Sequence, residues 1–348
     1  MYALCFLCYT LKRGIYIMNN FDWFKEAKYG LFIHFGLYSM LGGEYKGERS
    51  SNYAEWIQSN LRISNEEMGN IAKKFNPIKF NAMEWVSFAN FCGFKYIVFT
   101  TKHHDGFCMY DTKYTDYKVT AKDCPFHTNK NADIVRALYD AFRKEGLGIS
   151  TYFSKPDWHC EWFWNPEYDT ANRHINYKKE RHPEWWKNYQ DFTYNQLKEL
   201  MTEYGNFDIL WLDGGWVRGE DVHLDKLLAE VRSTTQPGLI SVDRAIKGRN
   251  ENYQTPERGI PETQLNHPWE SCITLSHAWG YIPNVKFKSA RTVVGMLAEI
   301  CAKGGSLALG VGPTPKGLIQ PEVEAILKEV GAWMKANGEA IYNTRITP

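Results

Sequence analysis

The sequence lacks an excess of charge of either sign. Its 348 residues carry 41 Lys and Arg against 40 Asp and Glu, and no block of basic residues stands out from the formal net charge of +1. Nucleic acids and anionic membranes are bound by clustered basic charge, so we expect neither as a partner. The apolar stretch at the start of the chain is also far shorter than the roughly 20 residues that cross a bilayer.

Signs of secretion are missing as well. A secretory signal places its positive charges before its apolar run, whereas here Lys12 and Arg13 follow the run. No N-x-[ST] glycosylation site occurs, and the eight cysteines are scattered over a chain too long to depend on disulfides. We therefore expect a cytoplasmic protein with reduced thiols, in which residues 1–17 are an N-terminal extension and residues 18–348 form one domain.

Apolar residues, which make up 44% of the chain, recur in two patterns. Short runs rich in β-branched and aromatic residues are typical of buried strands, and longer segments with apolar residues three and four apart are typical of helices. The expected strands are 29–36, 94–101, 146–153, 207–213, 238–244, 270–276 and 306–312, and the clearest helices are 81–93, 131–146, 185–205, 289–305 and 321–338.

Strands that alternate with helices predict a mainly parallel sheet, either open or closed into a barrel. An open nucleotide-binding sheet carries a G-x-G-x-x-G turn after its first strand, and residues 36–56 contain no such motif. No internal repeat or low-complexity linker divides the chain. We therefore predict an α/β fold, a (β/α)8-like TIM barrel in a single domain.

In such a barrel the active site is built by residues at the carboxyl ends of the strands. The predicted strand ends carry imidazoles, carboxylates, phenols and a guanidinium. Polar groups would not recur so regularly at strand ends by chance, so this pattern predicts an active site there. In chain order these residues are His34, Lys102, His103, His104, Asp105, Tyr152, Asp157, Trp158, Asp213, Asp243 and Arg244.

Asp213 ends the most apolar strand, ILWLD, and is followed by two glycines, which allow a sharp turn and a close approach by a ligand. A carboxylate there can act as a nucleophile or general base, or it can merely cap a turn or helix. At least one of His103 and His104 faces the pocket if the strand pleat continues, because successive side chains point to opposite faces. His34 can equally be a histidine satisfied within the core.

Tryptophan is abundant, with 13 residues, many of them in or just beyond the predicted strand-end loops. Sugar rings stack their C–H faces on aromatic rings, so we predict a carbohydrate ligand; the alternative is that these side chains only pack long loops onto the barrel. Hydrolysis of a glycosidic bond needs two carboxyl groups. Asp213 is the first candidate, and Glu270, Glu257 and Glu55 all remain open as the second.

Seven motifs taken in order resemble the α-L-fucosidases of glycoside hydrolase family 29, from about Trp23 to Tyr342. The resemblance implies a (β/α)8-like barrel that hydrolyses terminal α-L-fucosyl linkages of oligosaccharides or glycoconjugates. It implies retention through a covalent fucosyl-enzyme intermediate, with no cofactor and no metal. The motifs are FKEAKYGLFIHFGLYS, NYAEW, FTTKHHDGF, DILWLDGG, NYQTPE, PWESCITLSHAWGY and NGEAIYNTR.

The resemblance also implies roles for single residues. Asp213 resembles the nucleophile of the family and Glu270 its general acid/base. Histidine and arginine cations would keep the nucleophile ionised, and burial against Trp269 would keep the acid protonated. The residues that the resemblance assigns to fucose binding are His34, Glu55, Trp56, His103, His104, Tyr152, Arg244 and Trp279.

The sequence departs from the family pattern in reading HFG where HWG is more usual, and about six residues follow Tyr342 where relatives commonly continue into a β-sandwich. Two alternatives stay open. Paired histidines with an aspartate at strand ends also suit a metal-dependent barrel hydrolase, and the same barrel without catalysis would be a fucose-binding lectin. Assembly into a homo-oligomer is compatible with the sequence.

Overall fold

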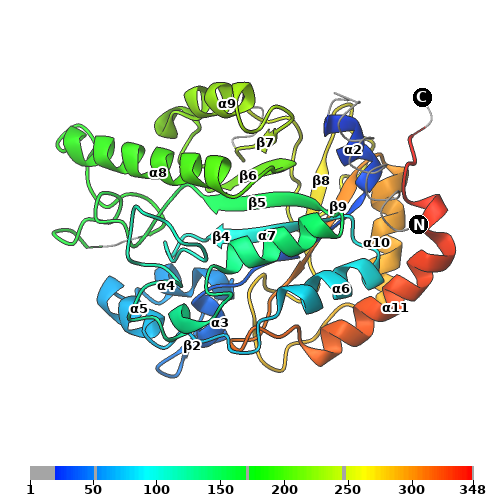
Figure 1. Cartoon of the computed structure of the whole chain (residues 1–348), viewed down its shortest axis with the longest axis horizontal. Helices are drawn as coiled ribbons and strands as arrows, with labels where there is room; N and C mark the ends of the chain where they lie inside the picture. Colours follow the sequence, from blue (N-terminus) through cyan, green and yellow to red (C-terminus); the bar gives the residue numbers. More distant parts are fainter. Residues whose placement is uncertain (1–19, 51–52, 170–171, 245–247, 347–348) are drawn as a thin grey trace.

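Seven parallel strands form one curled sheet in the order β7-β6-β5-β4-β1-β9-β8 (Figure 1). The computed structural model describes residues 20–50, 53–169, 172–244 and 248–346, so the expected N-terminal extension, residues 1–17, lies outside the described residues. The strands are β1 (Tyr29–Ile33), β4 (Tyr96–Lys102), β5 (Gly148–Ser154), β6 (Ile209–Asp213), β7 (Ile240–Val242), β8 (Glu270–Thr274) and β9 (Ser306–Val311), and a separate hairpin pairs β2 (Glu44–Tyr45) with β3 (Glu48–Arg49).

Residues 252–258 occupy the eighth position of the barrel, between β7 and β8. The backbone N–H of Asn252 donates to the carbonyl oxygen of Ser241 in β7 at 2.9 Å. On the other side, Gln254 and Glu257 form isolated parallel bridges to the segment that contains β8. The eight positions follow one another around the sheet in chain order, which confirms the predicted (β/α)8-like barrel.

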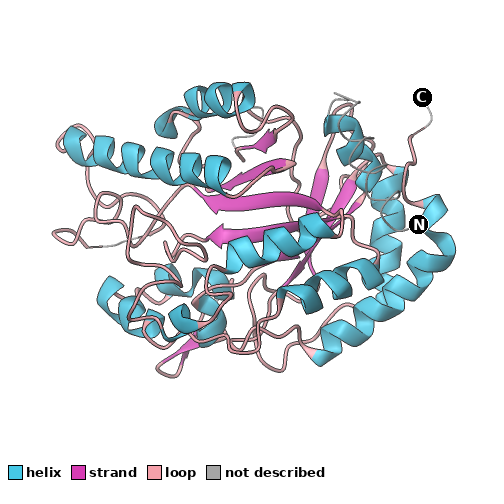
Figure 2. Cartoon of the chain, in the orientation of Figure 1, coloured by secondary structure: helices cyan, strands magenta, loops and turns pink. Residues whose placement is uncertain are grey.

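The predicted helices lie on the outside of the sheet (Figure 2). Their ends carry the expected signals: the Asn81 side chain accepts the N–H groups of Met83 and Glu84 at the start of the first one, and Gly93 follows its end with φ of +86°. The five helices are α6 (Ala82–Cys92), α7 (Ile134–Lys144), α8 (Pro183–Glu203), α10 (Ala290–Ala302) and α11 (Pro321–Asn337).

The structure also contains shorter helices that the sequence pattern did not single out. Most have fewer than three turns, so their apolar periodicity is too brief to stand out. They are α2 (Asn20–Ala27), α3 (Tyr38–Leu41), α4 (Ile57–Asn60), α5 (Asn65–Ala72) and α9 (Leu224–Ser233).

The inside of the barrel is filled mainly by large aromatic side chains. Space for them comes from small residues on neighbouring strands: a Cβ atom at Gly30 would lie 2.2 Å from the ring of Tyr96. Where the strands begin, Phe24 of α2 stacks on Tyr253 with 4.3 Å between ring centroids and closes that end. The barrel is therefore a packed core beneath its mouth, not a pore.

Two polar residues from the predicted strand ends pair with each other in the interior. The Lys102 ammonium lies 2.8 Å from an Asp157 carboxylate oxygen and also donates to the Gln196 side chain at 3.0 Å. Both partners of the pair are buried. Breaking such a pair leaves an uncompensated charge in a poorly solvated place, so these residues stabilise the loop that follows β5.

We therefore expect Lys102→Met to lower the free energy of unfolding by about 3–5 kcal/mol, because Asp157 would stay buried without its partner. Urea denaturation followed by circular dichroism measures the change. The matched control is Lys187→Met, which removes an exposed ion pair with Asp191 on α8 and should cost no more than about 0.5 kcal/mol. Equal effects of the two variants would contradict the assigned role of the buried pair.

Candidate active site

The polar strand ends surround a cavity of about 340 Å³ at the mouth of the barrel. This volume is within the range of small-molecule sites. Two of the site residues expected from the sequence, His104 and Glu270, do not line it. The expected residues that do line it are His34, Glu55, Trp56, His103, Tyr152, Asp213, Arg244 and Trp279.

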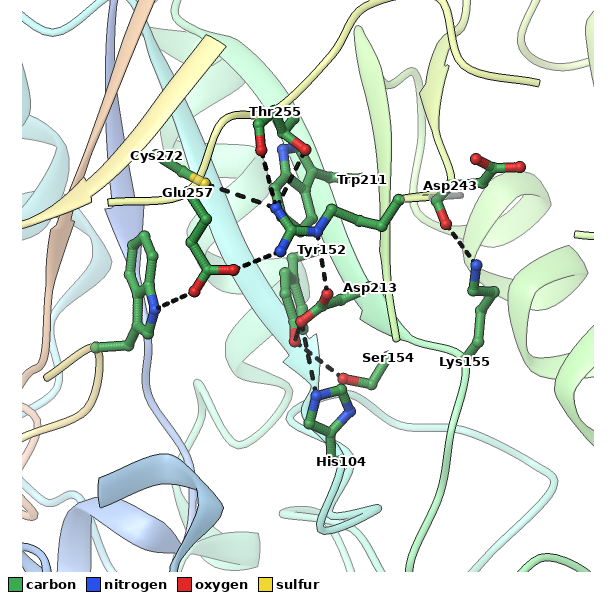
Figure 3. Close-up of polar contacts among 12 residues, drawn as sticks. His104, Tyr152, Ser154, Lys155, Trp211, Asp213, Asp243, Thr255, Glu257 and Cys272 are labelled. Atoms are coloured by element: carbon green, nitrogen blue, oxygen red, sulfur yellow. Dashed lines mark hydrogen bonds and ion pairs between the residues drawn. The ribbon is translucent and has the colours of Figure 1, made fainter. Parts of the chain in front are cut away.

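Asp213, the last residue of β6, lies at the centre of the polar network (Figure 3). Its Oδ2 accepts a hydrogen bond from the Tyr152 hydroxyl at 2.7 Å, and His104 Nε2 lies 3.6 Å from the same oxygen. Its Oδ1 is 3.5 Å from Nε of Arg244. His104 thus contacts the Asp213 carboxylate, and its expected role in fucose binding stays a prediction.

The surroundings of Asp213 keep it ionised. Burial by itself raises the pKa of this carboxyl, but the Arg244 guanidinium, the His104 ring and the Tyr152 hydroxyl together hold the pKa below its ordinary value. A charged carboxylate with fixed partners at the bottom of a cavity is the form that a nucleophile or general base requires.

The three histidines are neutral. Burial lowers the pKa of His34 to about 3 and of His104 to about 4, and it lowers the pKa of His103 well below the ordinary value. Of the histidine and arginine cations that the sequence analysis expected beside Asp213, only the Arg244 guanidinium is charged. Among the described residues, Nδ1 of His34 and of His103 has no hydrogen-bond partner, and a neutral imidazole offers one donor and one acceptor to a ligand hydroxyl.

Glu257 lies across the cavity from Asp213 in the segment that completes the barrel (Figure 3). Its Oε2 is 2.5 Å from Nη2 of Arg244, and its Oε1 accepts a hydrogen bond from Trp279 Nε1 at 3.3 Å. Arg244 also donates to Thr255 at 3.1 Å. The guanidinium therefore joins the two carboxylates, and the Glu257 side chain, 33% exposed, can still be reached from solvent.

Glu55 is a second carboxyl that lines the cavity, from a 3-10 helix (Ala54–Trp56). Its Oε2 accepts the backbone N–H of Gly280 at 3.1 Å, whereas Oε1 has no partner among the described residues. The residue is only 1% exposed, and burial raises the pKa of its carboxyl to about 7. It lies deep in the cavity, where it can bind a sugar hydroxyl.

Glu270 lies elsewhere. It is the first residue of β8, so its side chain enters the barrel interior below the cavity, with 0% exposure. It accepts hydrogen bonds from the Tyr96 hydroxyl at 2.6 Å and from Trp211 Nε1 at 3.1 Å. The expectation that Glu270 faces the substrate is therefore corrected: active-site side chains come from strand ends, and this carboxyl belongs to a strand start.

Several residues around the cavity were not predicted. Trp211 and Trp216 are among the 13 tryptophans of the chain, but no sequence pattern distinguishes the indole rings that line the cavity from those that pack in the core. Arg173 comes from the long loop between β5 and α8, and no local pattern marks it. Trp211 and Trp216 are among the tryptophans from which the sequence analysis predicted a carbohydrate ligand, whereas the lining residues without a role there are Phe32, Tyr53, Asn60, Arg173 and Cys272.

Two further searches concern other kinds of site. In the part of the chain that the structure describes, no group of three or more His, Cys, Asp and Glu side chains is arranged to hold a metal ion. Within that same part, none of the helices combines the length and the apolar character that spanning a membrane requires.

Comparison with known proteins agrees with this geometry. The family profile described as Alpha-L-fucosidase matches residues 17–339. The plasma α-L-fucosidase of Homo sapiens is 30% identical over 343 residues, which cover 92% of this chain and 69% of that protein. Isoenzyme 1 of α-L-fucosidase from Paenibacillus thiaminolyticus is 34% identical with a TM-score of 0.81, and the match covers 94% of this chain and 78% of that one.

A third relative bears on the reaction. The family 29 α-L-fucosidase of Bacteroides thetaiotaomicron, trapped as a covalent intermediate with 2-fluoro-fucosyl fluoride, is 30% identical with a TM-score of 0.81. The match covers 94% of this chain and 77% of that one. A covalent intermediate is the signature of retention. This chain belongs to the α-L-fucosidases of glycoside hydrolase family 29, which are retaining glycosidases.

Proposed function

We propose that Asp213 is the nucleophile and Glu257 the general acid/base in the hydrolysis of a terminal α-L-fucosyl linkage. The observation that carries this assignment is the single Arg244 guanidinium, which contacts Asp213 on one side and Glu257 on the other side of the same cavity. Two carboxyl groups that flank one small cavity are what retaining hydrolysis of a glycoside needs.

In the first step an Asp213 oxygen forms a bond to C1 of fucose while the bond from C1 to the leaving oxygen breaks. The protonated form of Glu257 gives its proton to that oxygen and becomes a carboxylate, and the leaving sugar departs as an alcohol. The Tyr152 hydroxyl and Arg244 fix the orientation of the Asp213 carboxylate before the attack, which saves the cost of reorganising it during the reaction.

In the second step water replaces the enzyme at C1. Glu257, now ionised, takes a proton from the water as the oxygen attacks C1, and the ester bond to Asp213 breaks. The product is fucose with its original anomeric configuration, because C1 has been inverted twice. In the ester, Asp213 carries no negative charge. The ionised form of Glu257 is then no longer opposed by a like charge nearby.

Fucose lies deep in the cavity in this proposal. Its hydroxyls bind the neutral His34 and His103 and the buried Glu55, three residues that line the cavity. Its methyl group packs on the indole of Trp279, which stacks on His34 with 4.8 Å between ring centroids. We infer that the substrate is a fucosylated oligosaccharide or glycoconjugate.

Three expectations from the sequence stay predictions. They are a cytoplasmic location, assembly into a homo-oligomer and a single domain over residues 18–348.

Exposure favours Glu257 over the other two carboxyls as the acid/base. The leaving oxygen joins fucose to the rest of the substrate, so its proton donor must stand near the opening of the cavity. Glu257 is 33% exposed, whereas Glu55 is buried in the cavity wall and Glu270 lies below the cavity. Glu257 also faces the water that must enter in the second step.

Asp213→Ala should lower kcat on 4-nitrophenyl α-L-fucoside by at least about 10³-fold while fucose still binds, because the covalent step is lost. Azide, a small external nucleophile, should restore turnover and give β-fucosyl azide, the inverted product, which NMR identifies. The control Asp191→Ala removes an exposed carboxylate from α8. Asp213→Ala with most of its activity left would remove this residue from the mechanism.

Glu257→Ala should lose about 10²-fold or more on a fucosylated disaccharide but far less on fucosyl fluoride, whose leaving group needs no proton. Azide should restore activity and give α-fucosyl azide, the retained product, because Asp213 still forms the intermediate. The same two measurements on Glu55→Ala and Glu270→Ala are the comparison. If either of those variants shows this pattern and Glu257→Ala does not, the acid/base is misassigned.

Glu270 should instead affect stability. Burial raises the pKa of this carboxyl to about 7 from 4.5, so between these values the folded protein holds a proton that the unfolded chain releases. The contribution of Glu270 to the free energy of unfolding is therefore full below pH 4.5 and is lost as the pH rises through 7. The loss is about 3 kcal/mol at most. Glu270→Gln should remove this part of the pH dependence in urea denaturation, whereas the exposed Glu329→Gln on α11 should not.

A further inference from the structure

The residues that line the cavity differ in depth. Phe32, Tyr152 and Cys272 are buried and form its floor, together with His103. At the opening the lining side chains are partly or fully exposed, and these include Trp56, Trp216, Asn60 and Arg173 together with Glu257. With fucose on the floor, as proposed above, the leaving group of the substrate must lie against this rim.

Arg173 is the basic residue of this rim. Its guanidinium carbon lies 4.6 Å from the centroid of the Trp216 ring and 5.9 Å from that of Trp56. Its backbone carbonyl accepts the indole N–H groups of Trp216 at 3.1 Å and of Trp158 at 3.4 Å. The backbone at Arg173 is thus held by two tryptophans, and the charged end of the side chain is presented beside two aromatic faces.

No carboxylate neutralises this guanidinium. Throughout the described part of the chain, no Asp or Glu oxygen lies within 4.0 Å of the Arg173 side chain, whereas the other cavity arginine, Arg244, is shared by two carboxylates. An arginine fork left without a partner beside a binding cavity is suited to a carboxylate or a sulfate on a ligand, because its parallel N–H groups match two oxygens of either.

The same loop continues the positive charge away from the cavity. Beyond Arg173, Lys178 and Arg181 line a second cavity of about 400 Å³, with His174 beside them and Asp169 as its acidic residue. Both cavities are therefore bordered by residues 172–182, which contain four basic residues and one acidic residue, whereas the whole loop 155–182 contains five of each. A substrate that extends from the first cavity along residues 172–182 meets excess positive charge.

We propose that Arg173, Trp216 and Trp56 form a leaving-group subsite for an acidic sugar, one that carries a carboxylate or a sulfate ester. The pyranose ring of this sugar packs against the partly exposed indoles of Trp56 and Trp216, and its anionic group pairs with the guanidinium of Arg173. The proposal rests on the placement of fucose described above and adds the class of sugar to which the fucose is attached.

The test compares matched fucosylated disaccharides. One pair has fucose linked to glucuronic acid or to glucose, and the other has fucose linked to 6-O-sulfo-N-acetylglucosamine or to N-acetylglucosamine. The ratio of kcat/KM for the acidic over the neutral member should be about tenfold or more in at least one pair. It should fall toward one in Arg173→Gln, stay partly raised in Arg173→Lys, and stay unchanged in Arg291→Gln, an exposed arginine on α10.

Added salt gives a second readout. Because exposed charges are screened within about 8–10 Å at 0.1–0.15 M salt, the preference for the acidic substrate should shrink as sodium chloride is raised, while the rate on the neutral substrate should not follow the same trend. A preference confined to one pair identifies the anion as a carboxylate or a sulfate. A ratio near one in both pairs, or a ratio unaffected by Arg173→Gln, would overturn the proposal.

Binding separates this proposal from the catalytic roles. Calorimetric titration of Asp213→Ala with the intact disaccharides measures affinity without turnover, and Arg173→Gln in that background should remove the preference for the acidic member. If Asp213→Ala still hydrolyses substrate, the catalytic assignment is wrong, and the ratio measured in the unchanged enzyme still decides the nature of the subsite.

Discussion

The site depends on how one guanidinium is shared. Arg244 contacts the carboxylates of Asp213 and Glu257 and donates to the Thr255 carbonyl oxygen, so each side of its planar fork has a fixed acceptor. A lysine would hold these acceptors less rigidly, because an ammonium is a single point charge on a flexible stem, whereas the guanidinium presents its N–H groups in a rigid plane. The positions of both carboxylates, and therefore the width of the space for C1 of the sugar, follow from where this side chain is held.

The barrel fold also limits which carboxyl side chains can reach the cavity, because strand ends and strand starts have different environments. Asp213 ends β6 and reaches the cavity, while Glu270 begins β8 and is enclosed by Tyr96 and Trp211. Both carboxyls follow or precede apolar runs and look alike in the sequence. The difference arises because parallel strands place all their carboxyl ends at one mouth and all their amino ends in the opposite layer of the core.

Burial and hydrogen-bond partners set the protonation states of the polar residues at the mouth of the barrel. Burial keeps His34, His103 and His104 neutral and keeps Glu55 close to half protonated near neutral pH, whereas Asp213 stays ionised because of its partners. The three imidazoles of the mouth therefore offer neutral hydrogen-bonding groups beside the ionised Asp213, which suits an uncharged deoxy sugar. Only the rim, through Arg173, offers a cation without a partner among the described residues.

The sequence by itself determined the alternation of strands and helices, the closed barrel, the family and the place of Asp213, because these are local: apolar periodicity, the glycines after ILWLD and contiguous motifs. The tertiary structure decided which glutamate reaches the cavity, that the imidazoles are neutral, and that Arg173 stands at its rim. Those properties depend on burial and on contacts between residues far apart in the chain, such as Glu55 with Gly280, and desolvation cannot be read from neighbours in sequence.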